Sequence, residues 1–201
     1  MRSFPLSAAL AAALLAGCSS GSSRASSLAY TDPPAASGWR LVRDPSSSAS
    51  RLVLALVGPA GTLTRGVGLN IQAPPGVRFA TFDGGLAVEE GGVYDLRSVD
   101  DDPAEPLAIA AGLKEGNVLS AGVFQKDRRR SAKDSGATLL RVALEIDPST
   151  GPLSGSAVTL RVLRAAAIPE DIGQAGDPPF VLARKLALTE LDVAVGTLEA
   201  K

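Results

Sequence analysis

The feature that most constrains the fold is a regular alternation of side chains between residues 137 and 146. A period of two places successive side chains on opposite faces of a β-strand and does not fit the 3.6-residue period of a helix. The sequence therefore predicts a long, half-buried strand here. One face is predicted to carry Thr138, Leu140, Val142, Leu144 and Ile146, and the other Leu139, Arg141, Ala143 and Glu145.

Short apolar runs of the same kind recur from Arg51 onward, separated by Gly, Pro, Asp and Ser about every ten residues, which is typical of all-β domains. Gly66 and Gly68 within one run indicate a bulge or a closely approaching backbone. A helical turn over 163–168 would end at Pro169. The other predicted strands cover residues 39–43 (an edge strand), 51–57, 67–71, 77–82 and 157–163, with weaker ones at 93–97, 107–111, 118–125, 180–188 and 191–198.

This many half-buried strands, with no convincing helix, predict two packed antiparallel sheets, an all-β β-sandwich of the jelly-roll type. Within it, Leu52, Leu54 and Leu56 should share one face of their strand.

Composition excludes several function classes. The chain has 20 basic and 21 acidic residues and no histidine. Near-neutral charge argues against nucleic acid as a partner. Without histidine there is no Ser-His-Asp triad, Cys-His dyad or imidazole metal ligand, and one cysteine allows no disulfide within the chain. The sequence therefore predicts a protein that is not an enzyme and has no cofactor.

The N-terminus has the organisation of a secretory signal peptide. Arg2 provides a positive start, residues 7–16 form a short Ala/Leu run, and small residues follow. The run is too short to span a bilayer as a helix, which takes roughly 20 apolar residues.

The residues Leu15-Ala16-Gly17-Cys18 resemble the lipobox of bacterial lipoproteins. The resemblance implies cleavage after Gly17, a diacylglyceryl thioether on Cys18 and acylation of the new amino end. Two or three acyl chains would hold the protein stably on a membrane, since each buried methylene contributes about 0.8 kcal/mol. Ser19 follows the cysteine, where Asp would indicate inner-membrane retention, so the outer membrane is expected.

These features divide the chain into three parts. Residues 1–17 are the predicted signal peptide, and residues 18–50 are the lipidated cysteine with a flexible tether rich in Ser and Pro. Residues 51–201 are the predicted β-sandwich.

The order of the predicted strands resembles a cohesin domain, a β-sandwich related to some carbohydrate-binding modules. The resemblance covers roughly residues 51–201 and implies a generic binding role. The usual Tyr-Asp-Pro after the second strand is replaced by Gln72-Ala73-Pro74-Pro75, so no binding residues are carried over. The segments that carry the resemblance are residues 65–71, 118–125, 137–146, 151–155, 158–163 and 191–198.

Two charged segments and a few aromatic residues are candidate sites. The basic loop, residues 126–134, could face acidic partners or anionic lipid, although charge runs are usually solvated loops. The acidic segment, residues 100–105, could hold calcium but lacks EF-hand spacing, so a polar loop is favoured. With Glu89-Glu90 it could in principle supply a glycosidase carboxylate pair.

Carbohydrate binding usually needs flat aromatic rings on a strand face. Tyr94 and Trp39 are the available platforms, since Tyr30 lies near the tether. The remaining candidates are assigned to the core: Phe79, Phe82 and Phe124. The sequence thus favours a membrane-anchored, non-catalytic protein-interaction or assembly module, with a module that binds envelope polysaccharide as the alternative. Exposed coplanar aromatic rings would favour the sugar, and a flat apolar sheet face rimmed by charge would favour a protein.

Overall fold

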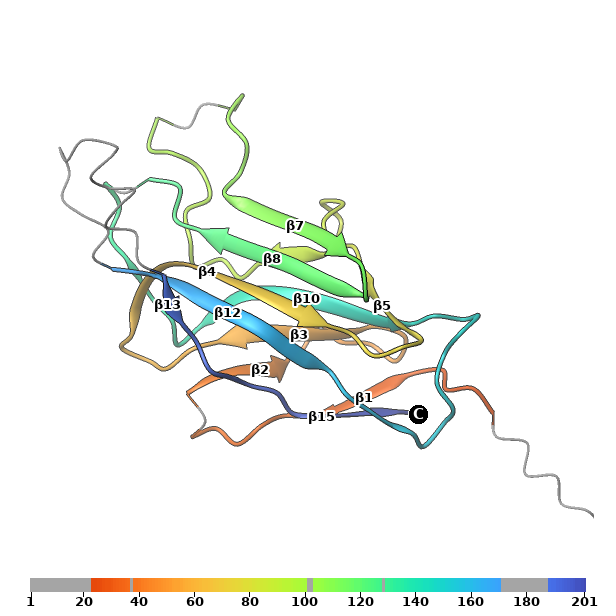
Figure 1. Cartoon of the computed structure of the whole chain (residues 1–201). Helices are drawn as coiled ribbons and strands as arrows, with labels where there is room; N and C mark the ends of the chain where they lie inside the picture. The colour runs from red at the N-terminus through yellow and green to blue at the C-terminus, as the bar shows by residue number, and fades with distance from the viewer. Residues whose placement is uncertain (1–22, 37, 101–102, 128, 171–187) are drawn as a thin grey trace, which may run out of the picture.

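Two β-sheets stack face to face in the computed structural model, which describes residues 23–36, 38–100, 103–127, 129–170 and 188–201 (Figure 1). The first sheet consists, in spatial order, of β14 (Val193–Ala194), β2 (Trp39–Arg43), β3 (Leu52–Val57), β10 (Thr138–Ile146) and β5 (Val77–Ala80), with β6 (Val88–Glu90) also paired to β10. The second consists of β13 (Thr189–Glu190), β12 (Arg161–Pro169), β4 (Leu63–Gln72), β8 (Val118–Phe124) and β7 (Ile109–Lys114), with β9 (Lys133–Asp134) also paired to β4.

A small third sheet near the C-terminus contains β1 (Leu28–Thr31), β15 (Thr197–Ala200) and β11 (Ala157–Val158). All strand pairs are antiparallel except β14 with β2. The prediction of an all-β antiparallel sandwich is therefore confirmed, apart from this one parallel pair. Among the described residues, no helix is long and apolar enough to cross a membrane.

The hydrophobic core lies between the two large sheets and follows the predicted alternation. Leu140, Val142 and Leu144 of β10 are completely buried, and Leu52, Leu54 and Leu56 of β3 join them from the same sheet. The second sheet contributes Val67, Leu69 and Ile71 of β4 and the facing residues of β8. One prediction for β10 was wrong. Leu139 also enters the core, because a register shift between Thr138 and Leu140 turns its side chain inward.

The folded region begins well before Arg51, where the sequence analysis placed the boundary between tether and domain. Ala25 is buried, and its N–H donates to the carbonyl of Pro152 over 2.9 Å. The Tyr30 hydroxyl donates to the carbonyl of Leu41 over 3.0 Å and accepts the N–H of Gly196 over 2.6 Å. Burial of the Tyr30 ring raises its pKa to about 12, although the Gly196 hydrogen bond lowers it. Most of the Ser- and Pro-rich segment is thus part of the sandwich.

Two local predictions differ from the structure. Residues 163–168 form no helical turn, because β12 runs from Arg161 to Pro169 and pairs with β4. Residues 93–97 form no strand, because the backbone of Asp95 bonds to Gln125 and Lys126. The predicted strand at 180–188 lies almost entirely outside the described residues.

Candidate functional site

The basic loop and the acidic segment predicted from the sequence lie against each other. Asp95 pairs with Lys133 at 3.0 Å and with Arg130 at 3.4 Å. Lys126 pairs with Glu105 at 3.6 Å, and Arg129 pairs with Asp100 at 2.9 Å. Most of the described charges of the two loops are therefore used within the molecule. Arg128, Asp101 and Asp102 lie outside the described residues.

Asp127 organises this ionic cluster. Its buried carboxylate accepts hydrogen bonds from Arg129 and from the N–H of Val99 at 3.1 Å. The Arg129 side chain holds the pKa of Asp127 far below its ordinary value. For Asp95, hydrogen bonds from Gln125 and then Lys133 lower the pKa. The described residues contain no group of three or more acidic or cysteine side chains placed to hold a metal ion. The two loops thus form a structural contact in this part of the molecule.

Glu89 and Glu90, which with the acidic segment were the candidate glycosidase carboxylates, contact neighbouring groups. Arg141 lies 3.4 Å from the Glu89 carboxylate and donates to the carbonyl of Glu90 over 3.1 Å. The Glu90 carboxylate accepts the N–H of Gly92 in its own turn. Both residues are thus engaged in contacts within the chain, and Glu90 also lines a pocket with Asp95 and Arg130.

The aromatic residues are distributed differently from the prediction. Tyr94 is buried, its hydroxyl 2.7 Å from that of Thr64, and burial raises its pKa to about 12 although the Thr64 hydrogen bond lowers it. Trp39 is half-buried against the core. Phe79 is buried as predicted, but Phe124 is 41% exposed. The predicted sugar platform at Tyr94 was therefore wrong, because the ring packs inward.

The outer face of the second sheet contains a row of residues with almost no side chain. Ala110 of β7 lies opposite Gly122 of β8, Gly122 lies opposite Gly68 of β4, and Gly68 lies opposite Ala166 of β12. Alternation directs these four positions away from the core, while their neighbours Val67, Ala121 and Val123 face it. The row crosses four strands and forms the floor of a groove of about 390 Å³.

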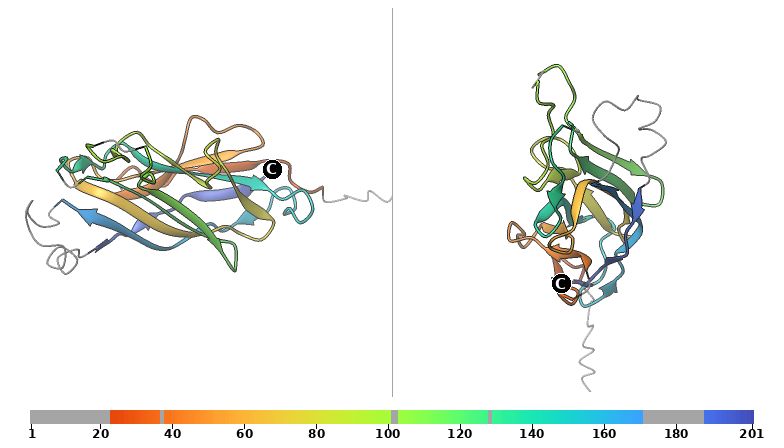
Figure 2. Two further views of the ribbon diagram at one scale, coloured as in Figure 1. Left: turned by 90° about the horizontal axis from the view of Figure 1, so that it is seen from above. Right: turned by 90° about the vertical axis from the view of Figure 1, so that its left-hand side faces the viewer.

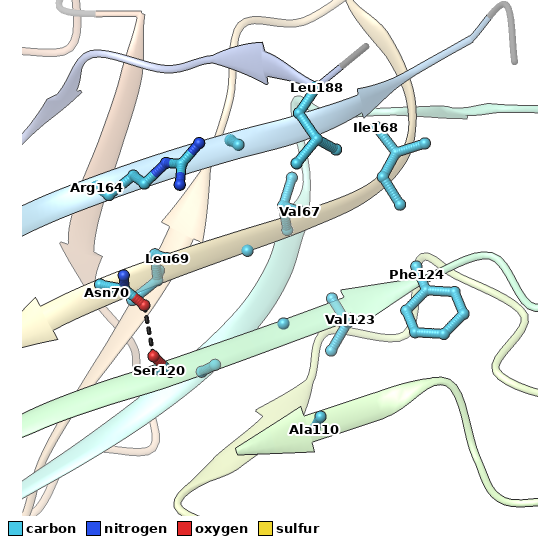
Figure 3. A pocket seen from close by; sticks show the side chains of 14 residues that line it. Val67, Leu69, Asn70, Ala110, Ser120, Val123, Phe124, Arg164, Ile168 and Leu188 are labelled. Atoms are coloured by element: carbon cyan, nitrogen blue, oxygen red, sulfur yellow. Dashed lines mark hydrogen bonds between the residues drawn. The ribbon is translucent and has the colours of Figure 1, made fainter. Parts of the chain in front are cut away.

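The two sides of this groove differ in polarity (Figure 3). Phe124, Ile168 and Leu188 lie on one side, and Asn70, Ser120 and Arg164 lie on the other. The Ser120 hydroxyl donates to the Asn70 side-chain oxygen over 2.6 Å. Arg164 is 63% exposed and pairs at 3.7 Å with Glu190, which is 79% exposed. The groove therefore has an apolar wall and a polar, charged rim.

Phe124 is held in the open by its cross-strand neighbour. Gly66 lies directly opposite it, and a Cβ on Gly66 would lie only 2.5 Å from the Cβ of Phe124. The absence of a side chain at Gly66 lets Phe124 occupy this space. Close approach is therefore confirmed at Gly66. The pairing of β4 with β8 has no register shift, but the pairing of β4 with β12 shifts register between Gly66 and Thr64, which agrees with the expected bulge.

Sequence reasoning missed this groove. It interpreted Phe124 as a core residue, and it did not connect the small residues of four separate strands. A signal was present, because Gly68, Gly122 and Ala110 occupy outward positions where strands usually carry large polar side chains. Recognising it required the strand register, which brings these residues into one row.

Cys18 lies outside the described residues, so its predicted lipid attachment stays a prediction.

No protein-family model matches the chain, and no curated protein matches it. Among solved structures, it is similar to the sixth cohesin of scaffoldin B from Acetivibrio cellulolyticus, determined in complex with a mutant Cel5 dockerin. The identity is 10%, the TM-score is 0.48, and the likeness covers 82% of this chain and 99% of that one.

Proposed function

We propose that this protein is a non-catalytic protein-interaction module that binds its partner in the groove on the outer face of the second sheet. The observation that carries the proposal is the row of Gly and Ala across four strands beside the exposed Phe124. Backbone exposed by small residues lets another chain approach closely, and a large exposed aromatic side chain typically dominates the energy of a contact.

The chemistry of the groove defines the partner. Apolar side chains of the partner would pack against Phe124, Ile168 and Leu188. Its polar groups would bond to Asn70 and Ser120, and an acidic side chain would compete with Glu190 for Arg164. A protein segment combines these groups within a short length. The apolar floor with a charged rim is the arrangement expected for a protein partner.

A polysaccharide is the alternative, and the distribution of aromatic side chains disfavours it. Sugar-binding faces usually present flat rings in a plane. Phe124 is the one aromatic side chain among the described residues that line the groove. A single ring fits a protein contact better than a sugar platform.

We also propose that lipid on Cys18 holds the module on the outer membrane. The support is the lipobox-like sequence and the short stretch of chain that follows it. Among the described residues, the first β-bridge joins Arg24 to Leu153. The residues between Cys18 and Arg24 could extend at most roughly 20 Å. The anchored domain would therefore lie close to the membrane surface.

The decisive experiment is a crosslinked pull-down from the native envelope with wild type, Phe124→Ala and Leu153→Ala. Leu153 is the matched control, since it is 47% exposed and does not line the groove. One stoichiometric protein should be recovered with wild type and Leu153→Ala and should be lost with Phe124→Ala. Recovery of glycan alone, or of the same protein with all three chains, would refute the proposal.

The anchor is tested separately with Cys18→Ala. We expect this variant to lose acyl labelling and to leave the membrane fraction, because no other cysteine can accept the thioether. Normal acyl labelling of the variant would contradict the anchor proposal without affecting the groove.

A further inference from the structure

The strand β7 is an edge of the second sheet, bordered at its start by Leu96, whose carbonyl accepts the N–H of Ala108 over 3.0 Å. It pairs with β8 over its whole length without a register shift, and no described strand pairs with its other side (Figure 1). Figure 2 shows the same strands from two further sides, with β7 and β8 in green. Strand edges of this kind are templates for pairing with another chain.

The hydrogen bonds to β8 show which residues of β7 direct their N–H and carbonyl groups away from the sheet. The N–H of Phe124 donates to the carbonyl of Ala108 over 3.0 Å, so even-numbered residues of β7 face β8. The odd-numbered residues Ile109, Ala111 and Leu113 then direct their N–H and carbonyl groups away from the sheet. In the part of the chain that the structure describes, none of these groups has a backbone partner on that side.

Other edges of the sandwich are protected. The terminal strands β13 and β14 contain two residues each. The strand β5 carries Arg78, which pairs with Glu145 at 3.2 Å. By contrast, β7 is six residues long, and Lys114 at its end is its one charged residue. Short strands and charged side chains are the usual protections of an edge, and β7 has little of either.

We propose that β7 pairs antiparallel with β7 of a second copy of this chain, centred on Ala111. The outward residues are symmetric about that position, so Ala111 faces its own copy and Ile109 faces Leu113. Leu113 is 61% exposed, whereas Ile109 is half-buried at the edge of the core. Pairing brings each Leu113 onto the Ile109 of the other copy, which removes the most exposed large apolar side chain from water.

The other face of the strand accommodates the same register. Ala110 lies opposite Gly112 of the second copy, so no large side chains meet there. The two Lys114 residues lie at opposite ends of the pair, where their repulsion is screened. Because Ala110 also lines the groove, the pairing places the two grooves on one continuous sheet. The pairing does not depend on the partner bound in the groove.

Sedimentation equilibrium of the full chain tests this pairing. All samples carry Cys18→Ala, so that neither a lipid nor a disulfide can join two copies. Between about 1 µM and about 1 mM, the range of weak association, the apparent mass should double. Leu113→Lys places a charge opposite Ile109 and should weaken association by tenfold or more. Leu163→Lys, at another leucine that is 53% exposed, should leave association unchanged.

Ala111→Pro is the second variant. It removes an outward N–H while keeping every hydrogen bond between β7 and β8, so it should abolish association while the chain stays folded. Circular dichroism checks the fold of each variant. A chain that stays monomeric to the highest concentration, or a dimer that both β7 variants leave intact, would overturn the proposal.

Discussion

The outer faces of the two sheets are organised in opposite ways. On the first sheet, Arg141 of β10 bonds to Asp44 through Nε and Oδ2 at 2.8 Å, and Arg51 lies 4.8 Å above the ring of Phe82. Phe82 in turn packs against a small apolar cluster of Val53, Ala80 and Ala143. On the second sheet, no described charged pair lies over the row from Ala110 to Ala166, and the exposed Phe124 lies beside it.

The contrast distinguishes side chains that bond to other parts of the same chain from side chains that are free to contact a partner protein. On the first sheet, the chain's own loops supply partners to the outward residues. Asp44 also accepts bonds from the backbone and hydroxyl of Ser46, so its carboxylate is fully engaged. On the second sheet, the residues of the Gly/Ala row are too small to need partners. Changes on the first face should therefore alter stability, and changes on the second should alter binding.

The largest effect is expected for Arg141→Met. The variant leaves the buried Asp44 carboxylate without its cationic partner, and breaking a buried ion pair costs about 3 kcal/mol. Urea unfolding followed by circular dichroism measures this loss. The matched control on the second face is Arg164→Met, where the ion pair is exposed and the loss should stay below about 0.5 kcal/mol. If both variants lost the same free energy of unfolding, the two faces would not differ in their contribution to stability.

Phe124→Ala should give the opposite pattern, a large loss of binding with a small loss of stability. Removal of the exposed ring should weaken partner affinity at least tenfold, about 1.4 kcal/mol. The free energy of unfolding should fall by less than about 1 kcal/mol, because the ring is 41% exposed and lies opposite Gly66, which has no side chain to pack against it. Titration of the recovered partner and urea unfolding measure the two quantities. A large loss of unfolding free energy in Phe124→Ala would show that Phe124 mainly stabilises the fold.

On the first face, acid should act through Asp44. Burial raises the pKa of Asp44, but hydrogen bonds from Ser46 and Arg141 outweigh it and lower the pKa below its ordinary value. A lowered carboxyl pKa contributes stability above the unfolded pKa of about 3.9, and this contribution is lost as pH falls through the folded value. Asp44→Asn should therefore reduce stability at neutral pH and flatten its decline below about pH 4.

The control for the acid experiment is Asp83→Asn, at an exposed turn position. That variant should keep the wild-type free energy of unfolding at neutral pH, because the side chain is exposed. Thermal unfolding at a series of pH values gives all three curves. If the stability of Asp44→Asn fell below about pH 4 as steeply as that of wild type, the Asp44 carboxylate would not contribute to the acid sensitivity.

The sequence allowed the strands to be predicted where a face is buried, and it was least informative about loops and outward residues. Alternation located β3, β4 and β10 because burial on one side enforces a period of two. It could not place Leu139, since a bulge depends on the partner strand. The end of β12 was interpreted as a turn because residues 163–168 contain three alanines in succession, which have no strong strand preference.

The candidate sites depended on contacts between distant segments, which the order of residues does not reveal. Lys133 and Asp95 each belong to a charged stretch, and only the folded loops bring them within 3.0 Å. Tyr94 and Phe124 exchanged their expected roles for a similar reason. Thr64 gives the Tyr94 hydroxyl a buried partner, whereas Gly66 gives Phe124 room to stay outside.

The smallest expected effect tests the floor of the groove directly. A Cβ on Gly68 would meet the Ala121 carbonyl oxygen at 3.4 Å, an ordinary contact, so Gly68→Ala should fold. Loss of glycine from the unfolded chain should raise stability by about 0.5 kcal/mol. The added methyl occupies the floor, so partner affinity should fall even as stability rises.

Gly66→Ala is the control, since its Cβ would collide with Phe124 and stability should fall instead. Urea unfolding and partner titration measure the two quantities. A Gly68→Ala variant that is more stable but binds the partner more weakly would show that the Gly/Ala row contacts the partner. Unchanged partner affinity would show that the row serves only the packing of the sheet.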